Sequence, residues 1–262
     1  MYRSFSGLYP MHKGWGDWLR GSKKKRYMFL ILILFLATIG ILYLGTESFQ
    51  IKKITVVGNE KIKKEDIIKR SGISYKQNIL KLDKGLVKER IETIPYLEVM
   101  SIKLSYPDEV IITVYERKTV AIIPYLNSYF IIDKDCNIVE ITDELDDIGY
   151  PLVQDMEIRS FVVGKKLVTE EEYQVKVLSR ILESIYQLEL ENQISEIMMG
   201  NPDDIELILT EGIRTRIGQA IEMDKKLIWL KSDKLKEVCQ GLTGGILDLS
   251  APSKPVFYPD ES

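Results

Sequence analysis

The sequence is almost without histidine, and this shortage restricts the chemistry that the protein can perform. Of 262 residues only His12 is a histidine, and it lies close to the amino terminus. Because Ser-His and Cys-His nucleophiles and most zinc sites need an imidazole, the region after residue 45 has no such site. That region also has no G-x-S-x-G or S-x-x-K motif and no glycine-rich phosphate loop.

Cysteine is also scarce, so the reactive groups that remain are mainly carboxylates. Cys136 and Cys239 belong to no C-x-x-C pattern, and we interpret them as small apolar residues, with one disulfide between them as the alternative. The loop at 142–153 is acidic, but its spacing fits no defined calcium motif, and we expect a solvated loop rather than an ion site. We therefore expect no catalytic residue, no metal, no cofactor and no small-molecule substrate.

Charge is distributed unevenly along the chain. Residues 1–45 hold seven of the 36 Lys and Arg residues and one of the 39 Asp and Glu residues, which gives this segment a net charge of +6. Residues 46–262 then carry a net charge of −9. Because nucleic-acid phosphates call for a basic protein face, we expect no nucleic-acid partner.

One long apolar run, at residues 27–45, contains no charged residue. At 1.5 Å per residue, about 19 helical residues span roughly 28 Å, close to the thickness of a bilayer core. A cleaved signal peptide is the alternative, but the residues after Leu44, GTESFQIKK, make a poor cleavage site. The sequence therefore predicts a transmembrane helix at 27–45 that contacts lipid.

The basic residues beside this helix predict its orientation. Six Lys and Arg residues lie in 13–26, whereas only Lys52 and Lys53 lie equally close to its other end. Since basic residues favour the cytoplasmic side, we expect residues 1–26 to be a cytoplasmic tail and the chain after residue 45 to be extracytoplasmic.

Residues 46–118 predict a small domain with the order β-α-α-β-β. Gly72 is the expected stop of the first helix, and Asp83 is the expected N-cap of the second, which we expect to turn Leu86 and Ile91 inward. The predicted elements are a strand at 51–57, helices at 63–72 and 83–94, and a hairpin at 96–117 that turns at Tyr106-Pro107-Asp108.

Residues 119–251 predict a second, β-rich α+β domain, followed by a C-terminal tail at 252–262. A capping box of Thr169 and Glu172 should open a long helix with Tyr173 on its inner face. In the turn at 133–137 we assign the left-handed residue to Asn137. The predicted elements are strands at 120–125, 128–133, 137–141 and 246–250, a hairpin at 203–218, and helices at 169–192 and 222–238.

The first domain resembles the POTRA module, and the whole chain resembles the bacterial division protein family FtsQ/DivIB. The stretches that carry the resemblance are ITVVGNEKI, NILKLD and IPYLEVMSIKLSYPDEVIITVYERKTVA. The family also has a short basic cytoplasmic tail, one anchor and then the POTRA module directly. The chain departs from the family at Thr119, where a proline is usual, and at Cys136, which takes the place of a glycine.

The resemblance implies a non-catalytic scaffold of the division machinery, located in the cell membrane and enriched at the septum. Such a scaffold helps to organise septal peptidoglycan synthesis. Its partners would be the coiled-coil division proteins of the FtsB/DivIC and FtsL type, which add a strand to the terminal strand of the second domain. The partner-binding residues that this implies are Leu247, Asp248, Leu249, Ser250, Phe257 and Tyr258.

Alternatives remain for both the site and the function. Leu247 and Leu249 fit a plain core strand as well as a binding strand. The function alternatives are an envelope enzyme, such as a carboxylate-dependent cell-wall hydrolase, and a POTRA scaffold in secretion. An enzyme should show a cleft with facing carboxylates, whereas a scaffold should show open strand edges.

Overall fold

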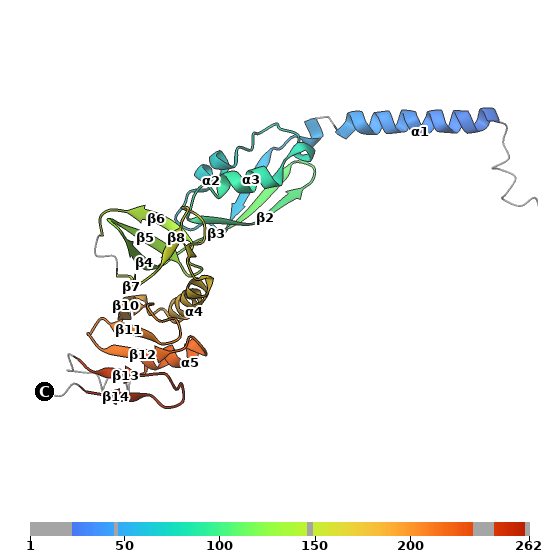
Figure 1. Cartoon of the computed structure of the whole chain (residues 1–262). Helices are drawn as coiled ribbons and strands as arrows, with labels where there is room; N and C mark the ends of the chain where they lie inside the picture. Colours follow the sequence, from blue (N-terminus) through green and yellow to red (C-terminus); the bar gives the residue numbers. More distant parts are fainter. Residues whose placement is uncertain (1–22, 45–46, 146–148, 233–243, 260–262) are drawn as a thin grey trace, which may run out of the picture. The chain divides into compact units, whose positions relative to one another are not determined.

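The structure is a computed structural model that describes residues 23–44, 47–145, 149–232 and 244–259, and it confirms the α+β class (Figure 1). The chain divides into two compact units. The first comprises residues 1–53, 74–82 and 104–110, and the second comprises residues 54–73, 83–103 and 111–262. The domain boundaries predicted from the sequence stay predictions.

α1 (Lys23–Leu44) is a continuous helix of 22 residues. It begins four residues before the predicted 27–45, because the basic residues of 23–26 are helical as well. Its apolar side chains, such as Phe29 and Leu36, are exposed. Within the described residues it is the one helix long and apolar enough to cross a membrane.

The remainder of the first unit joins three chain segments by backbone hydrogen bonds. After η2 (Glu47–Phe49), the Ile51 N–H donates to the Gln77 carbonyl (2.8 Å), and the Lys52 N–H donates to the Asp108 carbonyl (2.9 Å). The side chains of Lys52 and Asp108 also form an ion pair at 3.5 Å.

A three-stranded sheet has the order β1-β3-β2 and confirms the predicted β-α-α-β-β arrangement. Gly72 ends the first helix in the left-handed conformation (φ 68°), and the Asp83 carboxylate accepts the N–H groups of Gly85 and Leu86. The expectation for the Leu86 side chain is wrong, because it is 43% exposed. The elements are β1 (Lys53–Val57), α2 (Lys64–Ser71), η3 (Ile79–Lys81), α3 (Lys84–Ile91), β2 (Leu97–Ser105) and β3 (Glu109–Glu116).

A nine-stranded sheet dominates the second unit, with the order β14-β13-β12-β11-β10-β7-β4-β5-β6. The pairs β12–β13, β10–β7 and β4–β7 are parallel. The strands are β4 (Thr119–Tyr125), β5 (Ser128–Asp133), β6 (Ile138–Thr142), β7 (Leu152–Gln154), β10 (Ile194–Met198), β11 (Ile205–Leu209), β12 (Arg214–Gly218), β13 (Ile246–Asp248) and β14 (Val256–Tyr258). A separate pair is formed by β8 (Ile158–Ser160) and β9 (Val168–Thr169).

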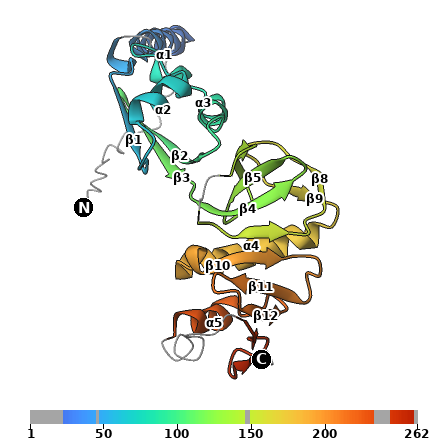
Figure 2. The ribbon, with the colours of Figure 1, turned by 90° about the vertical axis from the view of Figure 1, so that its left-hand side faces the viewer.

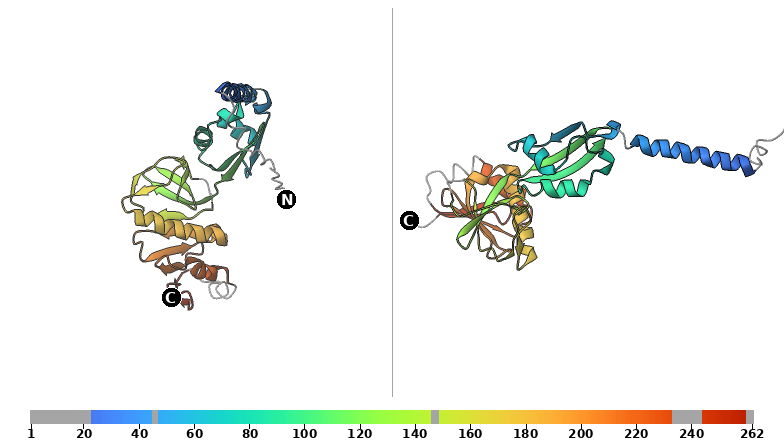
Figure 3. Two further views of the ribbon diagram at one scale, coloured as in Figure 1. Left: turned by 90° about the vertical axis from the view of Figure 1, so that its right-hand side faces the viewer. Right: turned by 90° about the horizontal axis from the view of Figure 1, so that it is seen from above.

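Two helices cover one face of this sheet and complete the core. α4 (Glu172–Leu188) runs across the sheet (Figures 2 and 3), and α5 (Met223–Leu227) lies on the same side (Figure 1). The Ser184 hydroxyl donates to the Asp224 carboxylate (2.5 Å) and joins the two helices. The short helices η4 (Glu191–Gln193) and η5 (Ile228–Lys231) follow α4 and α5. Both helices bury apolar side chains against the sheet. At β4, β5 and β6 further apolar side chains are buried outside this core: Ile122, Ile131 and Val139.

Three local predictions in this unit are wrong. Thr169 does not cap α4, because it belongs to β9 and its hydroxyl donates to the Glu171 carbonyl (2.7 Å). Tyr173 points outward and is 47% exposed. The left-handed residue of the turn is Cys136 (φ 62°) rather than Asn137.

The cysteines can be placed only in part. Cys136 is buried and is a free thiol, and burial raises its pKa above the usual value. Cys239 lies outside the described residues, and so does the end of the predicted helix at 222–238, from residue 233 onward.

Candidate protein-interaction site

The six predicted partner-binding residues lie together at the β13–β14 end of the large sheet. β13 pairs with β12 in parallel and with β14 in antiparallel orientation. Leu247 lies opposite Phe257, and Asp248 lies opposite Val256. The sequence interpretation treated 252–262 as a proline-broken tail, but the chain turns after Ser250 and returns as β14. The edge strand is therefore β14 rather than 246–250.

The six residues divide between the two faces of the sheet. Leu247 and Leu249 are buried in the core, and the Phe257 ring packs against that core. Tyr258 is 55% exposed, and Asp248 is partly exposed on the opposite face. Leu247 and Leu249 can thus be core residues while the neighbouring strand β14 binds a partner.

Backbone hydrogen bonds show which way β13 directs its polar groups. The Arg214 N–H donates to the Gly245 carbonyl (3.0 Å), and the Leu249 N–H donates to the Arg216 carbonyl (2.8 Å). The backbone N–H and C=O groups of successive strand residues point to opposite sides. In β13 those of the odd-numbered residues therefore point toward β12, and those of residues 246 and 248 point toward β14.

This alternation determines the polar groups at the open edge. Val256 and Tyr258, opposite the even-numbered residues, direct their N–H and C=O groups toward β13. Phe257, between them, directs its N–H and C=O away from the sheet. No described strand pairs with that side of β14.

Two contacts hold β14 in place. Gly245 has a φ of 136°, and a Cβ atom there would lie 2.6 Å from Cζ of Phe257, so only glycine lets the ring pack over the backbone. The indole Nε1–H of Trp229 donates to the Pro252 carbonyl (2.8 Å) and fixes the turn between the strands.

The face beside the edge carries fixed charges. The Ser250 N–H donates to the Asp248 carboxylate (2.8 Å), and hydrogen bonding with Ser250, helped by the nearby Arg216 and Lys226, lowers the pKa of Asp248. The Arg216 guanidinium also binds Asp204 through two hydrogen bonds, which raises the pKa of Arg216. Asp248 is therefore ionised at neutral pH.

This arrangement suits recognition of an extended segment. An open edge offers main-chain hydrogen bonds to an added strand, and the flanking side chains select the strand. Within the described residues, no group of three or more His, Cys, Asp or Glu side chains is placed to hold a metal ion.

Comparison with known proteins places the chain in a family. Residues 49–117 match the model of the FtsQ-type POTRA domain. The cell division protein DivIB of Clostridium botulinum (strain Hall) is 30% identical over 254 residues, which cover 92% of this chain and 95% of that protein. The chain belongs to the DivIB/FtsQ family of cell division proteins.

A second DivIB protein supports the same placement. DivIB of Clostridium tetani is 28% identical over 80% of this chain and 79% of its own length. The solved extracytoplasmic domain of Geobacillus stearothermophilus DivIB matches 43% of this chain and 87% of that domain, at 12% identity and a TM-score of 0.31. Family membership gives the chain a role in cell division, and α1 fits a single membrane anchor.

The DivIB/FtsQ match also locates the POTRA module on the structure. The matched residues 49–117 contain the β1-β3-β2 sheet, in which β1 and β2 are the outer strands.

Proposed function

We propose that this DivIB/FtsQ protein is a non-catalytic, membrane-anchored scaffold that binds coiled-coil division proteins of the FtsB/DivIC and FtsL type. In this role it helps to organise septal peptidoglycan synthesis. The observation that carries the proposal is the edge of β14, where the backbone N–H and C=O of Phe257 point away from the sheet. A strand from the partner pairs with this edge and extends the sheet.

Membrane anchoring strengthens this kind of recognition. Partners that are confined to the same membrane meet the β14 edge at a high effective concentration. An edge of three residues then suffices, although each main-chain hydrogen bond adds only about 0.5–1.5 kcal/mol.

We expect a fluorescent fusion of the complete chain to concentrate at the division septum. The matched control is a fusion that ends at residue 45 and keeps the basic tail and all of α1. It should spread evenly over the cell membrane, because it lacks every protein-binding element of the proposal. An even distribution of the complete chain would contradict the proposed role.

We expect the amino terminus to face the cytoplasm and the residues after α1 to face outward, because the basic residues of 13–26 precede the apolar run. A membrane-impermeant maleimide added to intact cells should label a cysteine placed at Ser253 but not one placed at Ser4. The test uses a Cys136→Ser, Cys239→Ser background. Labelling at position 4 with protection at position 253 would reverse the topology.

A further inference from the structure

The residues that follow α1 are bonded directly to two distant segments of the chain. The Ile51 N–H donates to the Gln77 carbonyl, and the Lys76 N–H donates to the Ile51 carbonyl (2.9 Å). The next residue bonds the other segment, since the Lys52 N–H donates to the Asp108 carbonyl. Together these three segments form one end of the first unit, which we call the tip: the described residues 47–53, 74–82 and 104–110.

The tip is held close to the end of α1. Tyr43, in the last turn of α1, packs edge to face against Phe49, with ring centroids 6.0 Å apart. The chain from Leu44, where α1 ends, to Ile51 can span at most about 25 Å, because an extended chain advances about 3.6 Å per residue. Because α1 fits a membrane anchor, the tip lies within reach of the lipid headgroups.

The tip exposes large side chains that suit a boundary between lipid and water. Tyr75 is 56% exposed, Tyr106 is 59% exposed, and Leu80 is 43% exposed. Both tyrosines lie in turns, one in each of the two segments bonded to 51–52. A tyrosine ring is apolar and its hydroxyl is polar, and tyrosine is therefore enriched where a membrane meets water.

Two acidic residues of the tip are already neutralised by lysines. Asp108 pairs with Lys52 (3.5 Å), and Glu109 pairs with Lys53 (2.7 Å). Glu47 is the one other acidic residue of the tip. The acidic side chains of the tip therefore do little to repel an anionic surface.

Two further lysines of the tip are available to bind phosphate. Lys76 and Lys81 are exposed, and neither forms an ion pair with a described residue. Lys76 follows Tyr75 directly and Lys81 follows Leu80, so each charge stands beside an exposed apolar group. Residues 46–262 as a whole carry a net charge of −9. An anionic membrane surface thus attracts the tip and repels the remainder.

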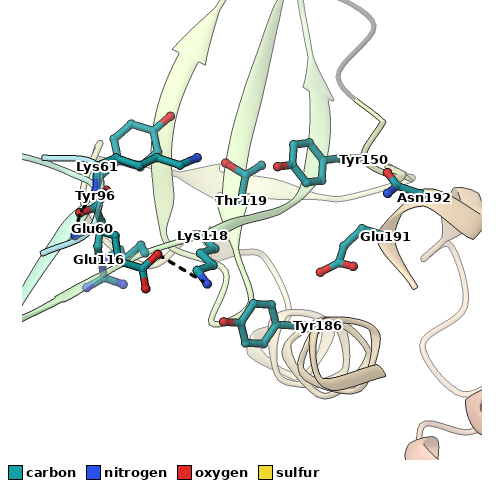
Figure 4. Close-up of a pocket in the computed structure, with 11 residues that line it drawn as sticks. Glu60, Lys61, Tyr96, Glu116, Lys118, Thr119, Tyr150, Tyr186, Glu191 and Asn192 are labelled. Atoms are coloured by element: carbon teal, nitrogen blue, oxygen red, sulfur yellow. Dashed lines mark hydrogen bonds and ion pairs between the residues drawn. The ribbon is translucent and has the colours of Figure 1, made fainter. Parts of the chain in front are cut away.

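Lys118 is an exposed lysine in a different setting (Figure 4). It lines a cavity of about 360 Å³ in the second unit and pairs with Glu60 (3.8 Å). The charged residues that line this cavity balance one another: Lys61, Arg117, Lys118, Glu60, Glu116 and Glu191. An anionic headgroup gains little there, and Lys118 therefore serves as the matched control lysine.

We propose that the tip is a lipid-binding surface, which docks on the headgroups of the bilayer that α1 crosses. Lys76 and Lys81 pair with the phosphates of anionic lipids. The rings of Tyr75 and Tyr106 lie between headgroups and acyl chains, and Leu80 adds apolar contact. The bilayer is the occupant because the anchor already holds the tip beside it. The contact needs no division partner, so it goes beyond the proposed scaffold role.

The test uses the complete chain in lipid nanodiscs, with a nitroxide spin label on Ser105→Cys, next to Tyr106. Cys239→Ser removes one native thiol, and Cys136 is kept because it is buried; the chain without Ser105→Cys should take up no label. The measurement is the collision rate of the label with neutral nickel ethylenediaminediacetate, which stays in water. We expect this rate to fall severalfold when phosphatidylglycerol is added to phosphatidylcholine nanodiscs, because the docked tip is shielded from water.

Variants outside the labelled segment test the two parts of the contact. Lys76→Gln and Lys81→Gln should each lower the ratio of docked to undocked tip about fivefold, as expected for a lysine close to an anionic surface. Lys118→Gln should leave this ratio unchanged. Tyr75→Ser should weaken docking, whereas Tyr75→Trp should retain it, because tryptophan also favours the interface.

A label on Met100→Cys tests whether the tip itself is the docking surface. Met100 is 61% exposed and lies six residues before Tyr106, about 20 Å along β2 at 3.3 Å per residue. We expect its label to collide with the nickel complex equally often in both lipids. Equal shielding at 100 and 105 would show that the domain lies on its side, against the proposal.

Three further results would overturn the lipid contact. The first is a label at 105 that is as accessible in anionic nanodiscs as in phosphatidylcholine. The second is unchanged docking by the double variant Lys76→Gln, Lys81→Gln, or an equal loss with Lys118→Gln. The third is shielding that appears only after the partner ectodomain is added, which would assign the tip to a protein. Because the nanodiscs otherwise hold no division protein, failure here leaves the β14 proposal untouched.

Discussion

Replacing Phe257 by proline should weaken binding of the FtsB/DivIC-type partner about thirtyfold relative to Phe257→Ala. Both substitutions remove the ring that packs against the core. Only proline also removes the N–H that points to the open edge, and its ring obstructs an incoming strand. Loss of one main-chain hydrogen bond together with this obstruction costs roughly 2 kcal/mol, and 1.4 kcal/mol is tenfold in affinity.

The comparison isolates the backbone because the ladder between β13 and β14 uses other residues. Val256 and Tyr258, not Phe257, lie opposite the residues of β13 that face β14. The measurement is the dissociation constant of the complete chain in micelles for the purified partner ectodomain. If Phe257→Pro binds as tightly as Phe257→Ala, strand addition at β14 is wrong.

Removing β14 altogether would be a poorer experiment. A chain that ends at Ser250 loses the edge strand but leaves β13 beside β12, with residues 246 and 248 newly unpaired. Because an unpaired strand edge offers free backbone N–H and C=O groups, the partner can then pair with β13 in place of β14. Retained binding by that chain would not exclude a role for β14.

The sequence pattern did not reveal that part of the predicted tail at 252–262 forms the edge strand β14. Pro252 and Pro255 lack N–H groups, and such residues argue against a strand in the predicted tail at 252–262. Both prolines lie outside β14, in and after the turn, where the missing N–H costs nothing. Three residues are too few to show an alternation, so β14 could be found only from its pairing with β13.

Local signals predicted the elements whose structure depends on neighbouring residues. Asp83 and Gly72 mark helix ends through their own side chain or backbone freedom, and the structure confirms both. In β3, apolar side chains alternate between the two faces of the strand, and Val110, Ile112 and Val114 are buried. Such features need no knowledge of the rest of the chain.

Predictions failed where a distant segment decides the outcome. Thr169 looked like a helix cap, but it pairs with Ile158 of β8 and is drawn into a strand. Tyr173 has the helical spacing of a core residue, yet its hydroxyl donates to Asp203 at the surface (3.2 Å).

Arg117 should be the most sensitive charged residue of the second unit. Its side chain is 10% exposed, and its guanidinium binds the Asp133 carboxylate (2.7 Å), which is 4% exposed. It also binds Glu98 (3.2 Å). Asp133 in turn accepts the backbone N–H groups of Asp135 and Asn137, so the ion pair supports the turn after β5.

We expect Arg117→Met to lower the free energy of unfolding by about 3–5 kcal/mol, because it leaves the buried Asp133 charge without its cation. The neighbouring Lys118→Met removes a half-exposed lysine whose ion pair is 3.8 Å long, and it should cost at most about 1 kcal/mol. The double variant Arg117→Met, Asp133→Asn should recover part of the loss, since asparagine keeps an acceptor for the turn without the charge. Urea unfolding of the complete chain in micelles measures all three. Equal losses for Arg117→Met and Lys118→Met would show that burial does not strengthen the Arg117–Asp133 pair.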